Sequence, residues 1–235
     1  MLNIGLLGCG RIGQVHGKTL KGMSTARAAA VSDFLPEAAT ALAAELGATV
    51  MTSDQMLSDP DIDAVVIGTP TTTHFDLIHQ AAANGKAIFC EKPVDLSVDR
   101  IRECLQAVQT AGVPFMTAFN RRFDPNFAHL KSQIDDQVIG NVEILTILSR
   151  DPAPPPIDYI KTSGGIFRDM VMINVSKCMD QWACCVPIIC WKIPSSCQTD
   201  QGLKPRRHSH FFLSDTPRHT VQKWNILLML SFRGL

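Results

Sequence analysis

The first half of the sequence alternates short apolar runs with longer amphipathic segments, and this alternation restricts the possible folds more than any other feature. The apolar runs cover residues 2–7, 26–33, 63–70, 86–93 and 114–120. Helix-like segments lie between them, over residues 36–47, 74–85 and 97–112. Strands that alternate with helices are typical of a parallel sheet covered by helices on both faces. We therefore predict an α/β fold with a doubly wound parallel sheet, of the Rossmann type, over residues 1–120.

The next part of the sequence predicts the beginning of a second domain. A helix-like stretch begins at Asp124, a glycine turn follows at Gly140, and residues 141–149 alternate like a strand. The proline cluster Pro152 to Pro156 favours an extended loop. We therefore assign residues 121–170 to an incomplete α+β substrate domain and residues 171–235 to an atypical tail.

Charge and hydropathy exclude several classes of partner. Lys plus Arg and Asp plus Glu number 22 each, so no net charge indicates a nucleic acid or a membrane surface. No apolar run reaches the roughly 18 residues of a membrane helix, and the N-terminus has no secretory leader. We expect a cytoplasmic protein whose eight cysteines are reduced thiols and whose partner is a small molecule.

A glycine-rich motif directly follows the first apolar run. Gly8, Gly10 and Gly13 form G-x-G-x-x-G, with Arg11 and Ile12 before the last glycine. In this position the glycines allow a tight turn, close approach to a pyrophosphate and close helix packing, with the helix N-terminus facing the phosphates. A glycine-rich turn in an unrelated fold is the alternative. We predict that these five residues bind a dinucleotide.

An acidic residue stands at the distance that this motif requires. Asp33 lies 20 residues after Gly13, at the end of the second apolar run. Its carboxylate could accept hydrogen bonds from both ribose hydroxyls, and it would repel a 2′-phosphate. The sequence therefore predicts NAD rather than NADP as the cofactor.

A lysine lies at the end of the fourth apolar run, at the sheet edge where ligands bind in doubly wound folds. Lys92, in Glu91-Lys92-Pro93, could hydrogen-bond a reacting hydroxyl and share in proton transfer. A single lysine after a strand is more often a solvated surface residue. Its neighbours in the sequence favour the functional interpretation.

Several motifs in the same order resemble one family. They are "GLLGCGRIGQVHG", "VSDF", "IGTPTTTH", "CEKPVDLS", "AFNRRFDPNF" and "SRDPAPPPIDYIKTSGGIFRDM". Together they resemble the inositol 2-dehydrogenases of the glucose-fructose oxidoreductase family, from residue 1 to about residue 170. The resemblance implies NAD-dependent oxidation of a secondary alcohol of a cyclic polyol, most simply myo-inositol to 2-keto-myo-inositol. It also implies a homo-oligomer, a tetramer in the family, built through the second domain.

The resemblance also implies roles for individual residues. Lys92 would contact the substrate and the nicotinamide, and Asp169 would be the second catalytic residue, on a helix beginning at "GGIFRD". The segments lining the cofactor cleft would include Thr69, Pro70, His74, Glu91, Asn120 and Arg121. No metal ligand is implied.

The sequence departs from the family four residues after Asp169. The family has a histidine there that removes the hydroxyl proton, whereas this chain has Ile173, followed by Asn174. No histidine occurs between His129 and His208. The alternative function is therefore a catalytically inactive NAD-binding fragment or interaction protein.

The tail has a different composition from the rest of the chain, and we interpret it as a frame change near Met170 that leaves a poorly ordered end. It contains all three tryptophans, and no regular period runs from Ser176 to His219. Zinc binding by the tail is an alternative, but its cysteine spacings give no C-x-x-C pairs. The possible ligands are Cys178, Cys184, Cys185, Cys190, Cys197, His208 and His210. The basic stretch "KPRRHSH" and the nine-residue "WNILLMLSF" predict neither a nucleic-acid site nor a membrane span.

Overall fold

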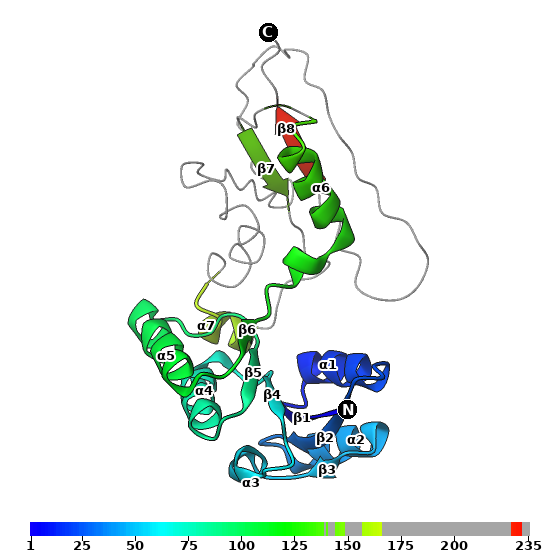
Figure 1. Ribbon diagram of the computed structural model, residues 1–235, viewed down its shortest axis with the longest axis vertical. Coiled ribbons are helices and arrows are strands. Elements are labelled where there is room, and N and C mark those ends of the chain that lie inside the picture. Colours follow the sequence, from blue (N-terminus) through cyan, green and yellow to red (C-terminus); the bar gives the residue numbers. More distant parts are fainter. Residues whose placement is uncertain (139, 141–143, 149–156, 166–226, 232–235) are drawn as a thin grey trace. The chain divides into compact units, whose positions relative to one another are not determined.

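The computed structural model describes residues 1–138, 140, 144–148, 157–165 and 227–231. The chain divides into two compact units, Met1–Ala118 and Phe119–Leu235, and we describe each by itself (Figure 1). The predicted proline loop, the helix carrying Asp169 and Ile173, and most of the tail lie outside the described residues.

The first unit contains a six-stranded parallel sheet in the order β3-β2-β1-β4-β5-β6. All five predicted apolar runs form strands in it. The strands are β1 (Leu2–Leu7), β2 (Ala26–Ser32), β3 (Thr49–Val50), β4 (Ala64–Ile67), β5 (Ala87–Cys90) and β6 (Phe115–Thr117). The chain moves outward from β1 to β3, then returns to place β4 on the other side of β1, so the direction of winding reverses between β1 and β4.

Helices cover both faces of this sheet, as the alternating pattern predicts (Figure 1). They are α1 (Arg11–Lys21), α2 (Pro36–Leu46), α3 (Ser53–Ser58), α4 (His74–Ala83) and α5 (Val98–Ala111), with the short η1 (Thr71–Thr73) before α4. Adjacent residues of β1 point to opposite faces, since Leu6 packs with Leu42 of α2 and Leu7 packs with Ile78 of α4 and Cys104 of α5. The doubly wound α/β class is thus confirmed.

Two predicted helix ends are formed by glycines in the left-handed conformation. Gly47 ends α2 with φ 68° and Gly112 ends α5 with φ 67°. Glycine adopts this conformation without the steric cost that a Cβ would add. Each glycine therefore ends its helix at the point where the chain returns to the next strand of the sheet.

The second unit is described in part. It contains η2 (Asn120–Phe123), α6 (Pro125–Asp135), β7 (Ile144–Leu148), α7 (Ile157–Thr162) and β8 (Leu227–Ser231). The strands β7 and β8 pair antiparallel. The predicted helix after Asp124 is confirmed, with the Asp124 carboxylate accepting from the first amides of α6. The predicted strand over residues 141–149 corresponds to β7.

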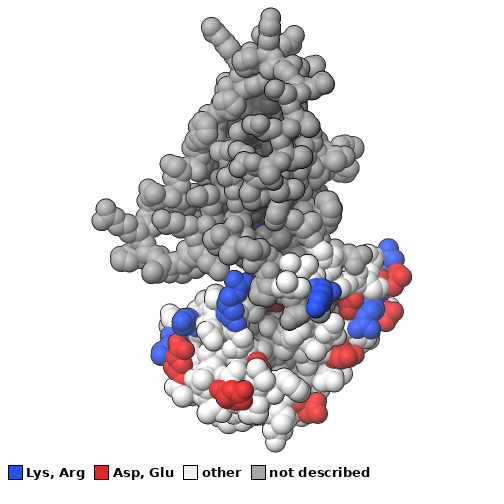
Figure 2. Space-filling view, turned by 180° about the vertical axis from the view of Figure 1, so that it is seen from behind, with Lys and Arg blue, Asp and Glu red and all other residues white. Residues whose placement is uncertain are grey.

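The described residues carry charged side chains of both signs on the surface and free thiols in the interior. On the face drawn in Figure 2, acidic and basic side chains of the described residues are interspersed. Within the described ranges no helix is long and apolar enough to cross a membrane. Cys9, Cys90 and Cys104 are buried free thiols. In the described part of the chain, no cluster of three or more His, Cys, Asp or Glu side chains could hold a metal ion.

Candidate functional site

The glycine loop after β1 is packed against the ends of two neighbouring strands. Gly8 has φ 97°, and a Cβ there would lie 2.6 Å from the carbonyl oxygen of Gly68 and 2.9 Å from the nitrogen of Thr69. Its backbone N–H donates to the carbonyl oxygen of Ser32 at 2.8 Å. Only glycine fits both the conformation and the contact.

The other two glycines of the motif have different surroundings. A Cβ at Gly13 would overlap the carbonyl oxygen of Gly8, so this glycine lets α1 pack directly on the loop. No described heavy atom would lie within 4 Å of a Cβ at Gly10, which is exposed at the N-cap of α1. No described side chain caps this helix end. Arg11 is exposed and Ile12 half-buried in the first turn, and the first backbone N–H groups of such a helix suit an anion.

Asp33 connects the end of β2 to the glycine loop. Its Oδ2 accepts the backbone N–H of Cys9 at 2.6 Å, and its Oδ1 accepts that of Leu35 at 2.8 Å. Each carboxylate oxygen keeps further acceptor capacity, so these bonds hold the carboxylate in place and leave it able to bind hydroxyls. Burial and then the charge of Asp33 raise the pKa of the Cys9 thiol to about 11.

The loop after β4 carries Thr69 and Pro70 and leads into α4. Thr69 is half-buried and Pro70 exposed. His74, the first residue of α4, is only 1% exposed. Its Nε2 lies 2.9 Å from the carbonyl oxygen of Thr69, and its Nδ1 lies 2.9 Å from that of Pro93. The His74 ring therefore joins the loops that follow β4 and β5.

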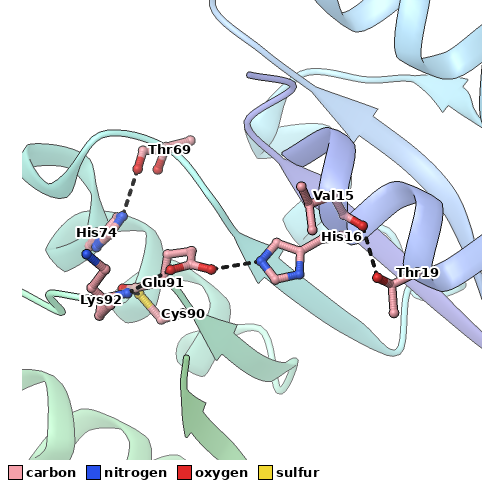
Figure 3. Close-up of polar contacts among 8 residues, drawn as sticks. All are labelled: Val15, His16, Thr19, Thr69, His74, Cys90, Glu91 and Lys92. Atoms are coloured by element: carbon pink, nitrogen blue, oxygen red, sulfur yellow. Dashed lines mark hydrogen bonds and ion pairs between the residues drawn. The ribbon is translucent and has the colours of Figure 1, made fainter. Parts of the chain in front are cut away.

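Glu91 and Lys92 follow β5 at the same sheet edge (Figure 3). Nε2 of His16, on α1, lies 2.9 Å from Oε1 of Glu91. The backbone N–H of Lys92 donates to Oε2 of the same carboxylate at 3.2 Å. Both Glu91 and Lys92 are half-buried. Glu91 thus connects α1 with the residue predicted to contact substrate.

The remaining predicted site residues belong to the second unit. Asn120 is exposed at the start of η2. The guanidinium of Arg121 lies 3.7 Å from Asp124 and 5.4 Å above the ring of Phe127, and burial lowers its pKa. Asp169 lies outside the described residues.

The predicted site residues of the first unit lie at one edge of the sheet. The glycine loop, Asp33, Thr69 and Lys92 follow the carboxyl ends of β1, β2, β4 and β5 respectively. In open α/β sheets, ligands bind at this edge where the winding reverses.

Two residues near this edge were missed from the sequence. His16 contacts Glu91 across 75 positions of the chain, so no local pattern could have indicated the pair. Phe34 is 96% exposed directly after Asp33, and this exposure is visible only in the structure.

Comparison with known proteins defines the class. Residues 2–119 match the family described as an oxidoreductase family with an NAD-binding Rossmann fold. The chain belongs to this oxidoreductase family, so the predicted resemblance and the predicted NAD-binding Rossmann fold are confirmed.

Among individual proteins, the chain is similar to inositol 2-dehydrogenases. The chain is 55% identical to an inositol 2-dehydrogenase of Rhizobium meliloti over 171 residues, covering 73% of this chain and 52% of the relative. It is 40% identical to a myo-inositol 2-dehydrogenase of Thermotoga maritima over 173 residues, covering 73% and 52%. The chain therefore spans about half the length of these relatives.

Solved structures agree with these relatives. A myo-inositol dehydrogenase from Corynebacterium glutamicum superposes with a TM-score of 0.70 at 42% identity, covering 76% of this chain and 54% of that one. A scyllo-inositol dehydrogenase from Lactobacillus casei, solved with bound NAD(H) and scyllo-inositol, gives 0.70 at 29% identity, covering 76% and 55%.

Proposed function

We propose that this protein oxidises a secondary alcohol of a cyclic polyol, with NAD as the hydride acceptor and myo-inositol as the substrate. The observation that carries the proposal is the position of Lys92, which follows β5 on the same sheet edge as the glycine loop and Asp33. The names of the relatives, inositol 2-dehydrogenases, support the choice of substrate.

The residues of the first unit fit a dinucleotide. The open space at Gly10 and the uncapped amides of α1, among the described residues, would receive the pyrophosphate. Asp33 would accept the ribose hydroxyls and disfavour a 2′-phosphate. Thr69, Pro70 and Glu91 would line the cleft, with Asn120 and Arg121 of the second unit as further candidates.

The reaction removes one hydride and one proton from the alcohol. Bound NAD supplies the hydride acceptor. Lys92 would hydrogen-bond the alcohol oxygen, orient it and share in the transfer of the hydroxyl proton. Ile173, at the family's histidine position, has no group that accepts a proton. Asp169 would act beside Lys92, as the family resemblance implies.

The experiment is to measure NADH binding and polyol-dependent NADH formation separately. We expect both, with turnover about 10²–10⁴-fold below that of a relative with the histidine, the usual contribution of a positioned general base. Lys92→Ala should abolish turnover and weaken NADH binding far less, since Lys92 would contact only the nicotinamide end of the cofactor. NADH binding without any turnover would instead favour the catalytically inactive NAD-binding protein.

We also propose a cytoplasmic location and a homo-oligomer of the family type. The relatives support a small-molecule substrate. Size-exclusion chromatography with light scattering would give the oligomeric state.

A further inference from the structure

The residues on either side of Lys92 are each contacted by a histidine from a different helix. Before Lys92, Oε1 of Glu91 lies 2.9 Å from Nε2 of His16 on α1 (Figure 3). After Lys92, the carbonyl oxygen of Pro93 lies 2.9 Å from Nδ1 of His74 on α4. The β5 strand ends at Cys90, and the backbone N–H of Glu91 still donates to the carbonyl oxygen of Ile67 at 2.9 Å. The two histidines contact the chain just beyond this last ladder bond, at the Glu91 side chain and the Pro93 carbonyl.

We propose that His16 and His74 are positioning residues that fix the backbone around Lys92 and thereby direct its side chain. The functional consequence rests on the proposed role of Lys92. Neither histidine need touch the substrate, because each acts through a neighbour of the lysine.

His16 is itself held in one orientation. Its ring packs edge-on against Phe89 of β5, with centroids 5.3 Å apart and an interplanar angle of 73°. The His16 and Glu91 side chains are 21% and 15% exposed, so solvent screens their contact less than that of a surface pair. Because Oε2 of Glu91 also accepts the Lys92 amide, a change in the His16 contact should be transmitted to the lysine backbone.

His74 joins two loops with one buried ring. Its second nitrogen contacts the carbonyl oxygen of Thr69. Moving the His74 ring would release Pro93 and Thr69 together. An imidazole with one N–H donates to only one of these two carbonyls, set by its tautomer, and loss of that donor would leave a carbonyl beside the buried ring unpaired.

The arrangement also links two parts of the candidate site. The helix that carries His16, α1, begins at the glycine loop. A ligand phosphate bound at that end of α1 and the backbone amide of Lys92 are therefore linked through α1 and the contacts of Glu91 with His16 and with that amide.

The reactivity of the Lys92 amine tests the proposal in the full chain. The chain is treated briefly with limiting acetic anhydride, and acetylation of Lys92 is compared by mass spectrometry with that of Lys18, which is exposed on α1. His16→Phe and His74→Phe keep an aromatic ring but remove the nitrogens. Each should change the Lys92 to Lys18 ratio by about twofold to tenfold, the range expected when one hydrogen bond is lost.

Matched controls lie on the same two helices. Thr19→Ala removes a hydrogen bond to the Val15 carbonyl on α1 (Figure 3), and His79→Phe replaces the α4 histidine that packs on Phe75. Both should leave the ratio unchanged. His16→Gln, whose amide can still donate to Glu91, should restore the ratio toward that of the unsubstituted chain.

The outcomes separate positioning from simple stabilisation. An unchanged ratio in folded His16→Phe and His74→Phe, with only a lower Tm, would overturn the proposal. If His74→Phe does not fold by circular dichroism, His74→Gln replaces it, and the same ratio decides. Since the measurement needs neither NADH nor turnover, failure of the proposed polyol oxidation would leave this result readable.

Discussion

The backbone amide of Cys9 donates to Oδ2 of Asp33 at 2.6 Å. The residue predicted to bind ribose therefore also holds the loop predicted to bind the pyrophosphate. A substitution at Asp33 should disturb both functions at once.

Asp33→Asn should weaken NADH binding by about tenfold, the effect of losing a charge-assisted hydrogen bond. It should also reduce discrimination against NADPH, because the negative charge that would repel a 2′-phosphate is gone. Fluorescence titration with both cofactors gives the two values of Kd.

Asp63→Asn is the matched control for this change. Asp63 Oδ2 accepts the backbone N–H of Asn3 at 2.7 Å, just before β4, at the opposite edge of the sheet. It should lower stability without altering NADH affinity. Equal affinities for NADH and NADPH in the unsubstituted chain would contradict the role of Asp33.

Two glycines of the motif, Gly10 and Gly13, should respond differently to alanine. Gly13→Ala should lower the free energy of unfolding by about 1–3 kcal/mol or more, because the new methyl group overlaps the backbone of Gly8. Gly10→Ala should leave stability nearly unchanged, since its φ of −69° suits alanine and the space is open, but should weaken NADH binding.

Urea unfolding and NADH titration of both variants separate the two effects. Gly10→Ala with unchanged NADH affinity would mean that no ligand approaches the loop at this point.

The sequence predicted the strands of the sheet well because each is an apolar run bounded by a turn. It missed β3, whose two residues are both exposed and carry no apolar pattern. It also missed α3, although Thr52 and Gln55 form a capping box that marks its start. Asp33 and Lys92 lie just after strands, as the apolar runs before them predicted, and their roles in binding stay predictions.

Contacts between distant parts of the chain were not predictable in the same way. The His16 contact with Glu91 depends on the packing of α1 beside β5, which no single segment encodes. His74 was predicted to line the cofactor cleft. The burial of its ring between the loops that follow β4 and β5 could not be read from composition or periodicity. The described part of the second unit shows the same limit, since nothing in the sequence paired β8 with β7.

The thiols of Cys9 and Cys104 should be unreactive near neutral pH. Burial is the main cause that raises the pKa of each to about 11. Because the thiolate is the nucleophile, alkylation at pH 8 should be at least about 100-fold slower than for a free cysteine with its pKa near 8.5. Iodoacetamide labelling followed by mass spectrometry measures this, and rapid labelling of either thiol in the folded chain would contradict it.

Asp95 should make stability depend on pH in the acid range. Burial raises the pKa of this carboxyl, but the Ser97 amide and the Arg100 guanidinium, each 2.8 Å away, outweigh burial and lower it. A lowered folded-state pKa means that the stabilisation is present above the unfolded value of about 3.9 and is lost as the pH falls through the folded value.

Asp95→Asn should therefore cost about 1 kcal/mol at neutral pH, a modest figure because Arg100 is partly exposed to screening solvent. The difference should vanish in acid. Asp99→Asn, which breaks an exposed pair with Arg102, is the control and should have little effect. Urea unfolding across the acid range measures all three proteins.

The position of β1 between β2 and β4 also has a kinetic consequence. Ile4 pairs with Ala64, 60 residues away, whereas it pairs with Ala28 across only 24. Closing the longer loop costs more chain entropy, so the β1–β4 pairing should form after the β1–β2 pairing. The carbonyl of Gly68 and the amide of Thr69, which restrict residue 8 to glycine, reach the loop only with that later pairing. During refolding, the nucleotide loop should therefore acquire its final shape in a late step, after much of the secondary structure is present.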